Sequence, residues 1–214
     1  MAGSGAVDLD WPWREALDRR WRDVPWVVLG VTVNGQRPDL VEVACLPIDG
    51  GRQGLLQSWL LRPQERITNE EVEQAPAFAE VASEIRDAMA GRVVVGHHLH
   101  DDVEVLARAM GGEWMPAVWV DTSQLAMATW PDRRTYALHA LAEDLGVQSP
   151  EGVQQHRAGH QAVLAAAVFL VLAEAGGDEE TGRELMWQAL GPRVCRAASR
   201  HAAPSGGPRG WPAC

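Results

Sequence analysis

The sequence contains no lysine, and all 19 of its basic residues are arginine. Acidic residues number 29, so the formal net charge is −10 at pH 7. This balance disfavours a surface that must hold a phosphate backbone unaided, because like charges repel. An acidic enzyme that acts on nucleic acid solves this problem with bound divalent cations. The presence or absence of metal ligands is therefore the deciding question.

Cysteine is also scarce, and the three residues Cys45, Cys195 and Cys214 include no Cys-x-x-Cys pair. This usage is typical of a reduced intracellular protein, and we expect a cytoplasmic location. The N-terminus lacks the basic and apolar regions of a secretory signal. No continuous apolar run approaches the ~18–20 residues of a membrane span, so we expect no membrane partner.

Apolar runs and turn signals predict one mixed α/β domain with helices on both faces of its sheet. Three strands are expected at residues 26–33, 40–48 and 54–61, forming an antiparallel meander joined by glycine-containing turns. Short apolar runs at 92–96 and 117–120 predict two parallel strands. Helical spacing of apolar residues predicts helices at 76–90, 103–110, 123–129, 136–145 and 158–175.

The two ends of the chain differ in composition from this domain, which we place at residues 25–176. Residues 1–24 are rich in tryptophan and arginine and are expected to form an appendage. A short helix over 13–22 would place Leu17 and Trp21 on one face. Residues 177–214 are predicted to add one helix near 180–190, followed by a disordered tail rich in glycine, proline and arginine.

Three segments of this domain carry motif-like patterns. Strands lead into residues 30–35 (GVTVNG) and 97–102 (HHLHDD), and a predicted helix opens with residues 156–161 (HRAGHQ). Their order and spacing resemble the DEDDh 3′–5′ exonucleases, the family of RNase T and of the epsilon subunit of DNA polymerase III. The resemblance covers roughly residues 25–176 and implies an RNase H-like fold.

Members of that family hydrolyse phosphodiesters with two metal ions, four carboxylates and a histidine base. By resemblance, Asp102 and His156 keep two of these positions, whereas Gly30, Thr32 and Gln161 stand where Asp, Glu and Asp are expected. The resemblance implies Mg²⁺ or Mn²⁺ as cofactor and a nucleic acid 3′ end as partner. Two hard dications require several anionic oxygens. We therefore expect metal binding to be weak or absent, and hydrolysis to be lost or nearly lost.

A histidine-rich alternative also fits the two later motif segments. His156 and His160 are four residues apart on one helical face, and His98 and His100 lie in the other segment. Such a nitrogen-rich set suits Zn²⁺ better than Mg²⁺. The simpler interpretation is that these histidines are exposed or hydrogen-bond locally.

Other polar residues near the motifs have two interpretations each. Asp102 would serve equally well as a helix cap before Val103. Arg133 and Arg134 lie between two predicted helices and could contact phosphate, although short basic pairs are most often solvated.

Three functional hypotheses remain open. The first is a binding scaffold, for nucleic acid or a protein partner, that has lost hydrolysis. The second is an active 3′–5′ exonuclease with a rearranged metal site, and the third is a histidine–metal protein on the same fold. The sequence leaves the oligomeric state open, with a dimer suggested by the family.

Overall fold

The computed structural model describes residues 13–34, 39–63, 70–112, 114, 116, 119–147 and 157–189. In chain order its elements are α1 (Trp13–Leu17), the 3-10 turn η1 (Trp21–Asp23), β1 (Trp26–Val33), β2 (Leu40–Asp49), β3 (Arg52–Gln53), β4 (Gln57–Leu60), α2 (Glu70–Glu73), α3 (Phe78–Met89), β5 (Val93–Gly96), α4 (Leu99–Ala109), β6 (Trp119–Asp121), α5 (Thr122–Thr129), α6 (Leu138–Asp144) and α7 (Ala158–Gly176). Residues 182–189 form a further helix. The predicted α/β architecture is confirmed.

The six described strands form one mixed sheet in the order β3-β2-β1-β5-β6, with β4 also paired to β2. β1 pairs antiparallel with β2, whereas β5 runs parallel to both β1 and β6. The predicted meander and the two added parallel strands are therefore confirmed. The central strand β1 is apolar and buried over residues 26–31, because both of its faces are covered there.

The predicted third strand is wrong in one respect, because the chain forms two short strands there. β3 pairs with β2 at Ile48 and Asp49, and β4 pairs with it between Glu42 and Cys45. Pro47 lies opposite the interruption and has no N–H to donate to a neighbouring strand. Its carbonyl instead accepts a hydrogen bond of 2.8 Å from the backbone N–H of Gly54.

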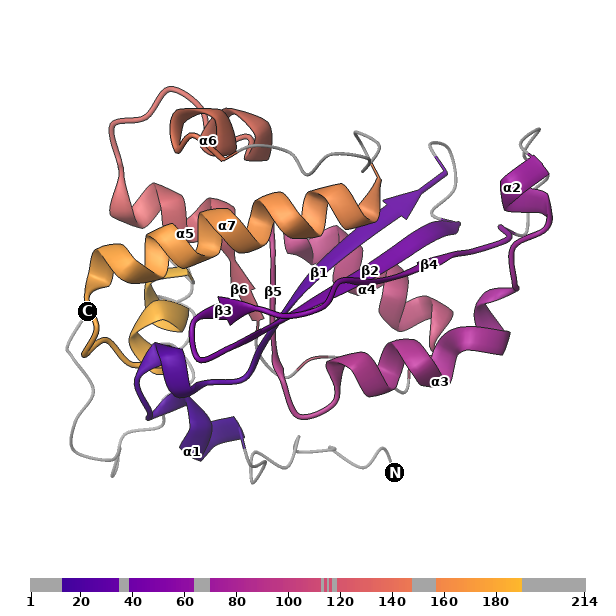
Figure 1. Ribbon diagram of the computed structural model, residues 1–214, viewed down its shortest axis with the longest axis horizontal. Coiled ribbons are helices and arrows are strands. Elements are labelled where there is room, and N and C mark those ends of the chain that lie inside the picture. Colours follow the sequence, from indigo (N-terminus) through magenta and orange to yellow (C-terminus); the bar gives the residue numbers. More distant parts are fainter. Residues whose placement is uncertain are drawn as a thin grey trace, which may run out of the picture.

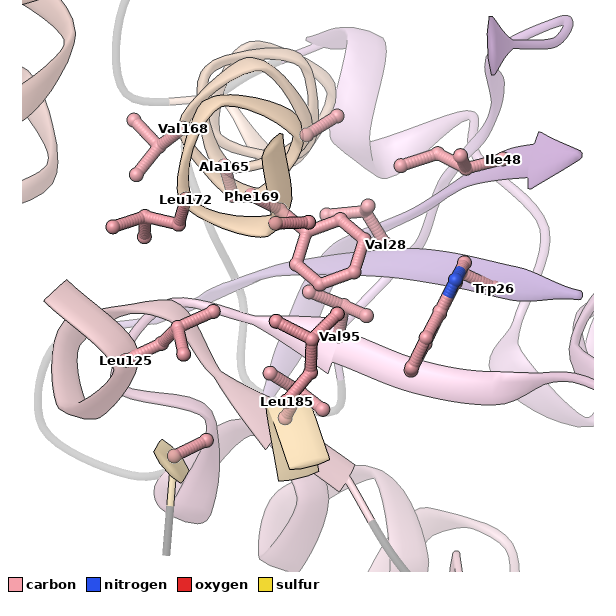
Figure 2. Packing of buried hydrophobic residues seen from close by; sticks show 14 of the residues in the cluster. Trp26, Val28, Ile48, Val95, Leu125, Ala165, Val168, Phe169, Leu172 and Leu185 are labelled. Carbon is pink, nitrogen blue, oxygen red and sulfur yellow. The ribbon is translucent and has the colours of Figure 1, made fainter. Parts of the chain in front are cut away.

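Two apolar layers lie on opposite faces of the sheet. On one face, Phe169 of α7 points toward Trp26, Val28 and Val95 of the sheet (Figure 2). α7 runs across this face, with α5 and α6 beside it (Figure 1). By length and hydropathy α7 would suffice to cross a membrane, but most of it is buried inside the domain, which accounts for its apolar composition.

The other face is covered by α3 and α4. Alternate residues of β1, Val27 and Leu29, pack there against Ile85 of α3 and Leu106 of α4. Cys45 belongs to the same layer and is fully buried, and burial raises the pKa of its thiol to about 12. Cys45 is therefore a small core residue in this layer.

The segments before β1 and after α7 join the core of the α7 face. The helix predicted over 13–22 ends at Leu17, yet Leu17 and Trp21 are both fully buried, as is Leu185. Trp21 meets Phe169 edge to face, with ring centroids 6.5 Å apart. Its backbone N–H donates a hydrogen bond of 2.8 Å to the carbonyl of Glu180. The predicted tail beyond residue 190 lies outside the described residues.

A matched pair of substitutions tests whether the N-terminal segment contributes to the stability of the domain. Leu17→Ala should lower the free energy of unfolding by about 2–5 kcal/mol, because it opens a cavity in the core. Leu55→Ala makes the same chemical change at a side chain that is 81% exposed, and should change stability by less than ~0.5 kcal/mol. Denaturant unfolding of both variants gives the comparison. Equal, small effects would mean that residues 13–24 are an appendage with no part in the core.

Candidate active site

The carboxyl ends of β1, β5 and β6 meet at one edge of the sheet, because these three strands are parallel. This is the edge where α/β sheets place their ligands. Gly30 and Thr32 lie toward the end of β1, α4 follows β5, and the first turn of α7 packs against β1. The structure thus assembles the described motif positions at one edge, while His156 lies outside the described residues.

Gly30, the first motif position, has no space for a side chain. A Cβ atom added there would lie 2.2 Å from the carbonyl oxygen of Ala158 and 3.2 Å from the backbone nitrogen of Ala162. The first distance is far inside the roughly 3.5 Å at which non-bonded atoms attract each other. The atoms in the way belong to the α7 backbone, so no rotamer change relieves the overlap. An aspartate fits at this position only if α7 moves.

Thr32, the second motif position, offers a neutral hydroxyl that is buried without a hydrogen-bond partner. It lies directly across the β1–β2 pairing from Glu42, whose residue surface is only 4% exposed. The Glu42 carboxylate accepts hydrogen bonds from Arg157 Nε at 2.8 Å and from the Ala158 backbone N–H at 3.0 Å. Glu42 is therefore engaged at the start of α7, and its arginine partner reduces the charge it could offer to a cation.

Asp102 lies inside the first turn of α4, which begins four residues earlier than predicted. The interpretation of Asp102 as the cap of this helix is therefore wrong. The cap position is His98, which has an unusual positive φ of 54°. Asp121 reaches across from the end of β6, and its carboxylate accepts from the backbone N–H groups of His98 and Leu99 at 3.2 and 3.1 Å.

The environment of Asp102 disfavours its charged form. Burial raises the pKa of its carboxyl to about 7, and the neighbouring Asp101 and Asp121 carboxylates add to this rise. Near neutral pH, a substantial fraction of the Asp102 side chains is therefore protonated. Asp102 is thus the one carboxylate at a motif position, and it is protonated in part when no cation is bound.

His97 is held as a neutral imidazole beside this turn. The Thr122 hydroxyl donates to the Gly96 carbonyl at 3.1 Å, and its oxygen lies 2.9 Å from His97 Nδ1. His97 Nε2 is buried, and the ring lies beside the backbone of Tyr136. Burial, followed by the neighbouring His98, lowers the pKa of His97 to about 4. Its role in the described structure is to fix the turn after β5.

The described residues contain no group of three or more His, Cys, Asp or Glu side chains placed to hold a metal ion. His98 and His100 are exposed, whereas His160 is fully buried and stacks on His139 with ring centroids 5.4 Å apart. His139 was not anticipated, because no sequence spacing links α6 to α7. The zinc hypothesis also depends on His156, so it stays a prediction.

Arg133 and Arg134, the predicted phosphate-contacting pair, lie in different environments. Arg133 forms an ion pair with Asp144 and lies over the Trp130 ring, 5.4 Å from its centroid. It is therefore engaged within the fold. Arg134 is exposed and remains the candidate for a phosphate contact.

These donors do not fit a pair of Mg²⁺ or Mn²⁺ ions. Gly30 supplies no ligand atom and has no room to gain one, and Thr32 and Gln161 are neutral. Asp102 is the one carboxylate at a motif position, and its charge is suppressed. Two dications held about 3.5–4 Å apart require more anionic oxygen than the described residues of this edge provide.

Comparison with known proteins identifies the class to which the fold and motifs belong. A family model described as exonuclease (RNase T) matches residues 30–169, so the chain belongs to the exonuclease family. It is 26% identical over 168 residues to the DNA polymerase III subunit epsilon of Aquifex aeolicus, covering 71% of this chain and 82% of that protein. It is also 26% identical to the 3′-5′ exonuclease DinG of Bacillus subtilis, spanning 70% of this chain and only 18% of DinG.

Solved structures agree with this membership. Exonuclease X, in complex with 5′ overhanging duplex DNA, superimposes with a TM-score of 0.62 at 25% identity, covering 75% of this chain and 99% of that chain. The nuclease domain of 3′hExo, a DEDDh family member bound to rAMP, superimposes with a TM-score of 0.56 at 12% identity, covering 76% of this chain and 96% of that domain. The expected RNase H-like exonuclease fold and DEDDh-type resemblance are confirmed.

The steric closure at Gly30 can be tested by adding one methyl group. Gly30→Ala should lower the free energy of unfolding by about 3 kcal/mol, because the added Cβ overlaps the α7 backbone. Gly159→Ala is the matched control inside α7, where the new Cβ would meet only the flexible Leu56 side chain, at 3.3 Å. That variant should change stability by no more than ~1 kcal/mol, because helix propensity offsets the adjustment of Leu56. A Gly30→Ala protein as stable as wild type in denaturant would contradict the closure.

The raised pKa of Asp102 predicts a specific dependence of stability on pH. Between about pH 4 and 7 the folded state keeps a proton that the unfolded state has lost, so the contribution of Asp102 to stability falls as pH rises. Asp102→Asn cannot ionise. Its advantage in stability over wild type should therefore grow as pH rises, and should reach on the order of 2–4 kcal/mol above about pH 7. Asp132→Asn, at an exposed turn, is the control, and parallel curves for wild type and Asp102→Asn would exclude the effect.

Proposed function

We propose that this exonuclease-family domain has lost two-metal phosphodiester hydrolysis and serves as a nucleic-acid-related binding scaffold. The observation that carries the proposal is the contact at Gly30, where the backbone of α7 fills the space of the first carboxylate side chain. A substituted ligand alone would leave a vacancy that another acid or a water could fill. A filled space leaves room for neither.

The remaining acids near this edge support the same conclusion. Glu42 is bonded to Arg157 and to the start of α7, and Asp121 accepts hydrogen bonds from the turn before α4 and from Ser123. Recruiting either carboxylate to a metal would remove a buried partner from the fold, and breaking a buried pair costs about 3–5 kcal/mol. Asp101 and Glu104 are exposed, and Glu104 pairs with Arg108.

Nucleic acid is the partner that the family context supports best. Exonuclease X has been solved with duplex DNA, and the relatives include a polymerase subunit and a 3′-5′ exonuclease. The net charge of −10 opposes such binding unless local cations offset it. Exposed Arg134, two residues before Tyr136 whose backbone lies beside His97, is the cation that we propose to contribute.

A degradation assay tests the loss of hydrolysis. A 3′-labelled single-stranded oligonucleotide is incubated with the protein and Mg²⁺, Mn²⁺, Zn²⁺ or EDTA, beside the Asp102→Ala variant. We expect no shortening beyond the EDTA control, because the site lacks the oxygens that hold two metals. Metal-dependent shortening that Asp102→Ala abolishes would establish an active exonuclease with a rearranged site. Shortening that is the same in both proteins would indicate a contaminating nuclease.

A gel-shift titration at low salt tests the partner. We expect a single-stranded oligonucleotide to shift at micromolar protein and to be released as salt increases, because phosphate contacts displace counterions. Arg134→Ala should weaken binding and reduce the salt slope by about one. Arg86→Ala, an exposed change on α3, should have no effect. The absence of any shift would contradict a nucleic-acid partner and favour a protein partner.

A further inference from the structure

The first turn of α7 is held against the sheet by three contacts, two from strands and one from the connection between β3 and β4. Gly30 of β1 admits the helix backbone, with the Ala158 oxygen where a Cβ would stand. Glu42 of β2 accepts a hydrogen bond of 3.0 Å from the Ala158 N–H. Leu56, between β3 and β4, reaches the backbone of Gly159 closely enough that an added Cβ would lie 3.3 Å away. We call these three residues the first-turn clamp.

The position of this turn is also fixed from the far end of the helix. α7 is one continuous helix of 19 residues, and Phe169 lies 5.1 Å from Trp26 between ring centroids. Ala158 and Ala162, which face Gly30, are both fully buried. Close-packed interiors resist displacement, because even a change in volume of one methylene group disturbs the surrounding side chains. The first turn of α7 therefore cannot move away from β1 without disturbing the packing of the core.

We infer that the first-turn clamp makes the loss of the metal site steric as well as chemical, so that restoring carboxylates at residues 30, 32 and 161 does not rebuild it. The inference rests on the proposed function, since it concerns the same edge of the sheet. It differs from a simple loss of ligands in its consequence. Missing ligands are recovered by substitution, whereas a space filled by helix backbone is not.

The three motif positions should accordingly respond in different ways. Thr32 and Gln161 already carry side chains and are partly exposed, so Thr32→Glu and Gln161→Asp require no new Cβ atom. Gly30→Asp adds a Cβ to a position where it overlaps the Ala158 carbonyl. Its carboxylate would also approach that carbonyl oxygen, which carries partial negative charge.

The test compares wild type, the Thr32→Glu/Gln161→Asp double variant and the triple variant that adds Gly30→Asp. Each protein is titrated with Mn²⁺ by calorimetry without nucleic acid, and its thermal midpoint is measured. We expect the triple variant to melt about 10 °C below the double variant, the shift that a strong overlap produces in a domain of this size. We also expect it to bind Mn²⁺ no more tightly than the double variant does.

Each outcome decides the matter. A triple variant that melts within a few degrees of the double and binds Mn²⁺ at least tenfold more tightly would overturn the inference. A triple variant that fails to fold while the double folds would support it. If the double variant also fails to fold, Gly30→Ala is compared with Gly159→Ala in the wild-type background, and equal thermal midpoints would overturn the inference. Hydrolysis by the wild-type protein would sink the proposed function instead, so the two failures are distinguishable.

Discussion

The contact between β1 and the first turn of α7 is the constraint on which the rest of this domain depends. Glycine inside a strand costs about 0.5–1 kcal/mol relative to alanine. At Gly30 the missing Cβ lets the α7 backbone reach the sheet, where Ala158 and Ala162 are small enough to meet it. The helix then runs across the sheet and brings Phe169 against Trp26. The apolar area buried along α7 offsets the cost of the glycine, and the same approach removes the space in which a metal ligand would stand.

Two acids at this edge show how partners decide the fate of a buried charge. Glu42 is almost fully buried, but a guanidinium and a backbone N–H donate to it, and it secures the start of α7. Asp102 has acidic neighbours instead of donors, and the result is a carboxyl with a pKa of about 7. Opposite charge and hydrogen bonds can outweigh the desolvation penalty of a buried carboxylate. Without them, desolvation favours the protonated form. The carboxylate that the fold stabilises is therefore the one committed to structure.

The sequence predicted the elements whose causes are local, and it failed where the cause lay elsewhere in the fold. β1 and α7 are marked by their own apolar patterns, and both were found at the predicted bounds or within a residue of them. The third strand is split because Pro47, on the neighbouring strand, cannot donate a hydrogen bond. α4 begins early because Asp121, from another strand, binds the N–H groups before it. The stacking of His139 on His160 likewise depends on how two helices pack.

The candidate site shows the same division between chemistry and position. Residue identity alone indicated that Gly30, Thr32 and Gln161 lack the charge for two metals, because charge can be counted from a sequence. Residue identity could not indicate that Gly30 differs from the other two positions in lacking space as well as charge. The distance from Gly30 to Ala158 depends on how α7, more than a hundred residues later in the chain, packs on β1. The neutral side chains at residues 32 and 161 lack only the negative charge of a carboxylate. The glycine at residue 30 is a packing requirement of the present fold, so the space available for a ligand at that position is tied to the stability of the domain.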